Sequence, residues 1–272
     1  MRDLNEIEAC LTKEPFRLAA RIVREIGNFT VALFGVFEST GGDQLRLAGT
    51  GTLVEAARSF WILTAAHVWE EILQESSRIG ISLKENVNHR FLLETKAITP
   101  VGLPWSAPGG EWGPDITLLC IPREYAGTIS AYQSFYNLER ERRTLLDVKS
   151  LEILVFMGTP AESGQYTETQ ASVEITGHFN RGKVHRHVRG GFDYFDLDVD
   201  LSLPGVPQNF GGVSGGGLWR VRIYGPRSSD EIATLHVLDG AAFYQTRVVG
   251  GHRTIRCHGN ETIRLAVANL RS

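Results

Sequence analysis

The chain has 272 residues, of which 42% are hydrophobic and 22% charged, so it can bury one large core or two smaller ones. Its 28 basic and 31 acidic residues leave a formal net charge of −3, and we therefore expect it to bind neither nucleic acid nor a membrane surface. Three scattered cysteines without a C-x-x-C pair, and the lack of an apolar stretch long enough for a signal peptide or a membrane span, favour a cytoplasmic location without disulfides or structural zinc.

Residues 1–27 are predicted to form a helical extension ahead of the rest of the chain. Pro15 suits the first turn of a helix, which tolerates a missing N–H, and apolar residues then recur at helical spacing until Gly27 ends the pattern. We expect an amphipathic helix over residues 15–26 that docks a regulatory protein partner or gates the functional site.

Short β-rich runs fill two halves of the chain, residues 28–122 and 150–260. In the first half we expect strands over residues 30–37, 45–53, 60–64, 91–98 and 116–121. In the second half we expect strands over residues 151–157, 171–179, 192–203, 216–223 and 234–244. A helical connector with a solvated charged run at 139–143 should join them over residues 123–149, and residues 261–272 should form a closing helix. The plan predicts an all-β fold of closed barrels or sandwiches.

Two charged segments of the second half stand out. Asp196, Asp198 and Asp200 are separated by single apolar residues, and this period of two puts all three on one face of a strand. A half-exposed strand explains the pattern better than a carboxylate metal site. The basic segment 181–189 is either a local contact for an anion or a partner, or a solvated hairpin tip.

The segment Gly212-Val213-Ser214-Gly215-Gly216 is the most informative in the chain. A serine nucleophile needs its hydroxyl on a tight turn, with backbone N–H groups free to bind the oxyanion that forms when a carbonyl is attacked. Glycines on both sides of Ser214 allow such a backbone. The alternative is an ordinary glycine-rich turn that contains a serine.

A histidine and an aspartate each adjoin a predicted strand of the first half. His67 follows an apolar strand and two alanines that leave room around its ring, which favours a general base over a core histidine. Asp115 follows Gly113 and Pro114 and leads into an apolar strand. A carboxylate at the mouth of a buried strand is costly unless it is paired, so Asp115 is the candidate to orient His67, with an ordinary turn aspartate as the alternative.

Together these residues resemble the trypsin-like, chymotrypsin-fold serine peptidases of the S1 type, in their intracellular bacterial form. The order His67, Asp115, Ser214 is shared, and so are the motifs T-A-A-H at 64–67, D-I-x-L-L at 115–119 and G-x-S-G-G at 212–216. The resemblance covers residues 28–260. It implies two antiparallel six-stranded β-barrels, with the site in the cleft between them.

The resemblance also implies a role for each matched residue. Ser214 corresponds to the nucleophile, His67 to the general base and later acid, and Asp115 to the group that fixes the His67 tautomer. The backbone N–H groups of Gly212 and Ser214 correspond to the oxyanion hole. The substrate is then a protein or peptide, and neither a metal nor an organic cofactor is needed.

Residues 240–245 resemble the strand that pairs with an extended substrate and forms one wall of the specificity pocket. Gln208 stands where trypsin has the acidic residue that selects Lys or Arg. With Phe243, Tyr244 and Gln245 nearby, Gln208 predicts a pocket for an uncharged P1 side chain.

Val213 stands where zymogen-activated members have an acidic residue that pairs with a newly cleaved N-terminal amine. We therefore expect that no N-terminal cleavage is needed to form the site. A narrow-specificity regulatory peptidase fits better than a quality-control protease, because the residues after Ser214 leave no room for a peptide-binding module. The sequence gives no indication of the oligomeric state.

Two other functions stay open. G-x-S-x-G is also the nucleophile elbow of α/β-hydrolases, in which Asp239 with His252 or His258 would complete an esterase triad. The βαβ alternation of a parallel sheet is missing, which argues against this fold. The second alternative is a catalytically idle peptidase fold that acts as a binding or signalling module, and the presence of all three triad residue types argues against it.

Overall fold

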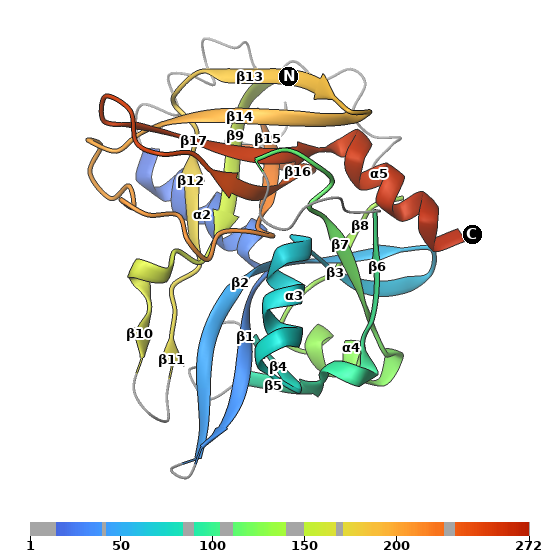
Figure 1. Cartoon of the computed structure of the whole chain (residues 1–272). Coiled ribbons are helices and arrows are strands. Elements are labelled where there is room, and N and C mark those ends of the chain that lie inside the picture. The colour runs from blue at the N-terminus through green and yellow to red at the C-terminus, as the bar shows by residue number, and fades with distance from the viewer. Residues whose placement is uncertain are drawn as a thin grey trace.

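The computed structural model describes residues 15–39, 42–83, 90–103, 111–139, 150–166, 171–225 and 232–271. Within these residues the chain is mostly β-structure, with one large sheet in each half and helices packed around them (Figure 1). No described helix is both long and apolar enough to cross a bilayer. The expected all-β fold with two antiparallel sheets is confirmed.

The first sheet belongs to the N-terminal half, and its strands lie in the order β5-β4-β1-β2-β3-β7-β6, with β8 beside β2. All neighbours in it are antiparallel except the short β2–β8 pair. The strands are Thr30–Ser39 (β1), Gly42–Ala56 (β2), Ser59–Thr64 (β3), Arg78–Ser82 (β4), Arg90–Glu94 (β5), Thr99–Gly102 (β6), Thr117–Ile121 (β7) and Tyr136–Asn137 (β8).

The second sheet belongs to the C-terminal half, is antiparallel throughout, and has the order β12-β9-β15-β16-β17-β14-β13. A separate two-stranded hairpin is formed by β10 and β11. The strands are Leu151–Gly158 (β9), Gln165–Tyr166 (β10), Ala171–Ser172 (β11), Thr176–Phe179 (β12), Val184–Arg189 (β13), Phe192–Asp200 (β14), Gly217–Tyr224 (β15), Ala233–Gln245 (β16) and His252–Gly259 (β17).

The described α-helices are α2 (Pro15–Gly27), α3 (Ala66–Glu75), α4 (Arg123–Ser130) and α5 (Asn260–Ala268). Single 3-10 turns lie at Thr95–Ala97, Ala161–Ser163 and Asn269–Arg271. The helices expected near the N-terminus, in the connector and near the C-terminus are all present. Helix α2 buries Ile22 and Ile26, and the Arg21 guanidinium donates to the Ile232 carbonyl at 2.7 Å. This helix is therefore part of the packed body of the protein.

The two halves share a hydrophobic core. One cluster of buried side chains draws on both sheets, including Val54, Trp61 and Leu63 from the first and Val155, Trp219 and Val221 from the second. Phe29 stacks on Trp219 with ring centroids 5.4 Å apart. Burying one large apolar side chain is worth about 1.5–3 kcal/mol. Apolar burial therefore holds the two halves in a fixed relative position, which any site between them requires.

Several features differ from the expectations. The sheets contain eight and seven strands rather than six each. Sequence patterning predicts neither β13 nor β17, because charged residues interrupt the alternation in both (VHRHVR and HRTIRCHG). Strand β13, which is the outer strand of its sheet, covers residues 184–189. The basic segment 181–189 is therefore mostly strand and not a hairpin tip. Strand β14 does alternate buried apolar residues with its aspartates, as expected. Residues 140–143 of the charged run lie outside the described residues.

Candidate active site

His67 lies at the start of α3, just after the buried strand β3 ends. Its Nδ1 lies 2.6 Å from Oδ2 of Asp115, and its backbone N–H donates to the other carboxylate oxygen at 3.0 Å. Asp115 is only 3% exposed, so these charge-assisted bonds offset the cost of burying its carboxylate. Because the carboxylate binds Nδ1, the opposite ring nitrogen, Nε2, is left as the base. Two of the three predicted triad residues are thus in direct contact.

The backbone of Asp115 is held by a second imidazole, that of His258 on β17. The Asp115 N–H donates to His258 Nε2 at 3.0 Å, so this ring is neutral and carries its proton on Nδ1. Burial lowers the pKa of His258 to about 4, which keeps the ring neutral near pH 7. The ring stacks on Phe243, with centroids 4.2 Å apart.

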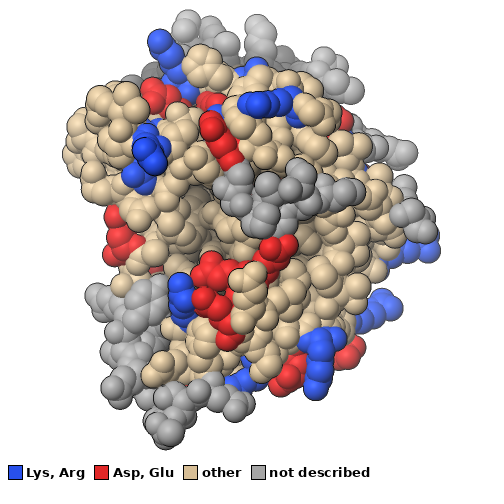
Figure 2. All heavy atoms as spheres, viewed as in Figure 1, with Lys and Arg blue, Asp and Glu red and all other residues tan. Residues whose placement is uncertain are grey.

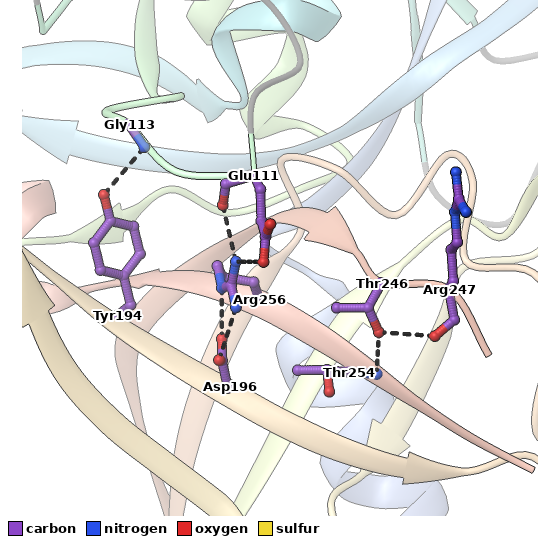
Figure 3. Close-up of polar contacts among 8 residues, drawn as sticks. All are labelled: Glu111, Gly113, Tyr194, Asp196, Thr246, Arg247, Thr254 and Arg256. Atoms are coloured by element: carbon purple, nitrogen blue, oxygen red, sulfur yellow. Dashed lines mark hydrogen bonds and ion pairs between the residues drawn. The ribbon is translucent and has the colours of Figure 1, made fainter. Parts of the chain in front are cut away.

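The loop that leads to Asp115 is tied to the second sheet by the buried side chain of Arg256 (Figure 3). The guanidinium donates two hydrogen bonds to Asp196, at 2.7 and 2.9 Å, and two to the carbonyl and carboxylate of Glu111, at 2.9 and 3.1 Å. Its plane also lies over the Trp112 ring, 3.5 Å from the centroid. Beside it, the Gly113 N–H donates to the Tyr194 hydroxyl at 3.3 Å. The Asp115 loop therefore rests on residues from the other half of the chain.

Ser214 lies on a tight turn that is pinned to the first sheet. The Ser214 carbonyl accepts a hydrogen bond from the Thr50 N–H at 2.8 Å. The turn needs glycine at two points, since Gly212 and Gly215 have φ angles of 87° and 90°. A Cβ on Gly215 would lie 2.0 Å from the Thr50 carbonyl oxygen, so the turn lies directly against β2.

The Ser214 hydroxyl makes no hydrogen bond to His67 in this structure. It donates instead to the Phe243 carbonyl at 3.4 Å, and no hydrogen bond joins it to the His67 ring among the described residues. Catalytic hydrogen bonds are often loose without substrate, and a serine hydroxyl changes partner by rotation about one bond. The structure therefore brings His67 and Asp115 together, and leaves the hydroxyl of the third predicted residue turned to another partner.

The N–H groups of Gly212 and Ser214 donate to no described residue. The orientation of each N–H is restricted by a hydrogen bond to the carbonyl of the same peptide. The Gly211 carbonyl accepts from the Ala161 N–H at 2.7 Å, and the Val213 carbonyl accepts from the Gly216 N–H at 2.9 Å. In a trans peptide the N–H points away from the carbonyl, so both free N–H groups face away from these partners. Two unsatisfied donors beside a serine are the elements of an oxyanion hole.

Val213 makes an apolar contact where the resemblance would place an acid. It is 2% exposed, and a Cβ on Gly158 would lie 2.6 Å from its Cγ1. Its side chain thus packs against β9 rather than joining an ion pair. The turn is formed with no charged residue at this position.

The residues expected to line a specificity pocket are engaged within the protein. The Gln208 side chain donates to the Leu201 carbonyl at 3.0 Å. The Gln245 side chain accepts from the Phe210 N–H at 3.0 Å and donates to Asn209 at 2.8 Å. Gln245 therefore spans from the end of β16 to the loop before the serine turn.

The other two predicted substrate contacts are largely buried. Phe243 is 3% exposed because its ring packs on His258, so β16 offers a substrate its backbone here and not the Phe243 ring. Tyr244 is half-buried beside Arg256, whose guanidinium lies 5.9 Å from its ring centroid. Of the predicted residues in this strand, Gln245 and Tyr244 keep partly exposed side chains.

The residues of the alternative esterase triad have other partners. Asp239 forms an ion pair with Arg220. His252 contacts Asp198 at 3.2 Å, and His258 binds the backbone of Asp115. None of these contacts joins Asp239 to either histidine.

The described cysteines are poor nucleophile candidates. Cys120 and Cys257 are free thiols, and burial raises the pKa of both. Cys10 lies outside the described residues.

The face seen in Figure 2 is hollowed where the two halves meet, and acidic side chains gather below the hollow. Helix α3, which lies in the same region of the view in Figure 1, carries Glu70, Glu71 and Glu75 after His67. Arg46 lies 2.8 Å from Glu75 and 3.5 Å from Glu71, which offsets part of this charge.

No protein-family model matches the chain, and no curated protein does. Among solved structures, the chain is similar to catalytically active tobacco etch virus protease complexed with product, with 10% identity, a TM-score of 0.41, and 89% of this chain and 78% of that chain covered. It is also similar to tobacco vein mottling virus protease, with 10% identity, a TM-score of 0.38, and 86% and 78% covered. Likeness at this level establishes no activity.

Three residues of the site were missed by sequence reasoning. Arg256 and Thr50 carry no motif, and His258 enters the sequence analysis only as part of the esterase alternative. Each acts on a residue more than a hundred positions away, so only the fold reveals the pairing. The weak signal available is that an arginine and a histidine alternate with the apolar residues Ile255 and Cys257.

Proposed function

We propose that the chain is a serine endopeptidase that hydrolyses peptide bonds through an acyl-enzyme. Ser214 is the nucleophile, His67 the general base, and Asp115 the group that orients His67. The observation that carries the proposal is the 2.6 Å contact between the His67 ring and a carboxylate that is 3% exposed. A buried carboxylate bound to both the ring and the backbone of one histidine fixes the tautomer that a general base requires.

Each step is assigned to groups of this chain. The Ser214 hydroxyl leaves the Phe243 carbonyl and attacks the peptide carbonyl carbon while His67 Nε2 takes its proton. The carbonyl oxygen becomes an oxyanion, which the N–H groups of Gly212 and Ser214 bind. His67 then protonates the leaving amine as the C–N bond breaks. Water adds to the acyl-enzyme by the same route, and Ser214 regains its proton as the carboxylic acid leaves.

The substrate is proposed to be an extended protein segment with an uncharged P1 side chain. The backbone of β16 at 243–245 supplies the pairing surface, and Gln245 closes one side of the pocket through Phe210 and Asn209. The acidic residues on α3 disfavour acidic substrates through charge repulsion. We propose a narrow-specificity regulatory peptidase that needs no N-terminal cleavage, as Val213 offers no partner to a new amine.

The decisive test is covalent labelling by a fluorophosphonate, which reacts with an activated serine. We expect the wild type to be labelled, Ser214→Ala to be inert, and His67→Ala to react far more slowly. Ser202→Ala is the matched control, since its hydroxyl lies on a surface loop and donates to Asp200 at 2.7 Å. A folded wild type that resists labelling, or a Ser214→Ala variant that is still labelled, would contradict the proposal.

Substrate preference is tested with peptides that differ only at P1. We expect uncharged residues to be cleaved fastest. A strong preference for Lys or Arg would show that the pocket is assigned to the wrong residues.

A second candidate function is a catalytically idle binding module. It is favoured by one observation, the contact of the Ser214 hydroxyl with the Phe243 carbonyl instead of His67. If the chain is an idle module, the wild type should show no turnover. The His67→Ala variant should then bind extended peptides with the affinity of the wild type.

A further inference from the structure

Thr50 lies at the centre of the contacts between the serine turn and the first sheet. It lies on β2, is fully buried, and its side chain forms a hydrogen bond with Gly212. Its hydroxyl donates to the Gly212 carbonyl at 2.7 Å and accepts from the Thr159 N–H at 3.0 Å. The hydroxyl is thus used both as a donor and as an acceptor, which fixes its orientation.

These bonds control the conformation of Gly212. The peptide before Gly212 is held by the Ala161 N–H on the Gly211 carbonyl, and the peptide after it by Thr50 on the Gly212 carbonyl. A glycine rotates more freely than any other residue, so hydrogen bonds on both flanking peptides restrict Gly212 to its φ of 87°. If the Thr50 hydroxyl is removed, the peptide between Gly212 and Val213 keeps one hydrogen bond, from the Val213 N–H to the Phe210 carbonyl at 3.1 Å.

Thr50 also connects this turn to the base. Its backbone N–H holds the Ser214 carbonyl at 2.8 Å, and its own carbonyl accepts from the Thr64 hydroxyl at 2.8 Å. Thr64 ends β3, directly ahead of the segment that carries His67. One residue therefore joins the serine turn to the strand that delivers the histidine.

We propose that Thr50 is a positioning residue, whose hydroxyl holds the Gly212 N–H in the direction of the substrate oxyanion. The proposal rests on the proposed function and adds to it a residue that no motif marks. Because Val213 cannot form a charged anchor for this turn, the neutral Thr50 hydroxyl takes that role. The effect is expected on the rate of acylation and not on substrate binding, since the oxyanion exists only after attack.

The test compares Thr50→Val, which keeps the shape and loses the hydroxyl, with Thr50→Ser, which keeps the hydroxyl. The substrates are 4-nitrophenyl acetate and its thionoester, whose C=S sulfur accepts hydrogen bonds weakly. We expect Thr50→Val to slow acylation by the oxoester about 100-fold, the lower end of what losing an oxyanion donor costs. The thionoester rate and KM should stay near wild type, and Thr50→Ser should restore most of the oxoester rate.

Thr30→Val is the matched control, because Thr30 is equally buried on the neighbouring strand and donates to the Ile26 carbonyl at 3.4 Å. An unchanged oxoester rate in Thr50→Val, or an equal loss with both esters, would overturn the proposal. If the wild type reacts with neither ester nor fluorophosphonate, the proposed function fails instead. The role of Thr50 is then tested by crystal structures of the wild type and Thr50→Val, and an unchanged Gly212 conformation in the variant would overturn it.

Discussion

The two parts of the candidate site are anchored in opposite directions and by different chemistry. The Asp115 loop belongs to the first half and is held by side chains of the second sheet, namely His258 and Arg256. The Ser214 turn belongs to the second half and is held by Thr50 of the first sheet. The first anchor uses ionisable groups and the second uses only neutral ones. Acid and salt should therefore loosen the carboxylate side of the site before the serine side.

The largest effect is expected from breaking the carboxylate itself. Asp115→Asn places an amide N–H against His67 Nδ1 and leaves Nε2 protonated, which removes the base. By comparison with a triad of this kind, turnover should fall by about 10⁴-fold. The measurement is the rate of fluorophosphonate labelling with thermal stability monitored alongside.

Asp239→Asn is the control for this change. It neutralises a carboxylate that is paired with Arg220 away from His67. Unchanged labelling is expected, and a collapse of labelling in this variant alone would favour the esterase triad instead.

The second prediction breaks the charged anchor of the Asp115 loop. Arg256→Met leaves Asp196 partly buried without its partner, and loss of one member of a buried pair costs about 3–5 kcal/mol. Since Asp196 is 17% exposed, we expect about 3 kcal/mol of unfolding free energy to be lost, by urea denaturation. Turnover should also fall by about tenfold, as the loop that carries Asp115 loses its support.

Arg264→Met serves as its control, because Arg264 is 42% exposed and pairs with Glu261 on the same helix. A change of under about 0.5 kcal/mol is expected there. Equal losses in the two arginine variants would show that burial of Arg256 is not what matters.

The third prediction uses pH to separate the two anchors. His258 has a pKa of about 4 when folded against 6.5 as the reference for the unfolded chain. Between these values the unfolded state binds a proton that the folded state does not, so stability falls as pH drops from 6.5 to 4. The loss at full extent is about 3 kcal/mol. His178, whose pKa burial also lowers to about 4, contributes in the same window.

His258→Gln should remove the contribution of His258, and the glutamine carbonyl oxygen can still accept the Asp115 N–H. The unfolding free energy, measured by urea titration at intervals between pH 4 and 7, should then vary by about 3 kcal/mol less over this range. Thr50→Val should leave the slope unchanged because threonine does not titrate. An unaltered slope in His258→Gln would show that this ring is protonated in the folded protein.

The sequence predicted the segments that carry short-range signals. The strand that ends before His67, the turn around Ser214 and helices α2, α4 and α5 follow from local periodicity, glycine and proline placement, whereas helix α3 was not predicted. The contact of His67 with Asp115 was also predicted, because a buried carboxylate requires a partner. What could not be predicted is which residues of one half hold the other. Thr50 and Arg256 look like ordinary strand residues until the register of both sheets is known.

Because His258 and Arg256 lie on β17, synthesis must proceed past position 258 before the loop that leads to Asp115 acquires either anchor. A nascent chain that has already exposed His67, Asp115 and Ser214 outside the ribosome still lacks the support of its carboxylate loop. Under the proposed function, the site would therefore become competent only once β17 has joined its sheet.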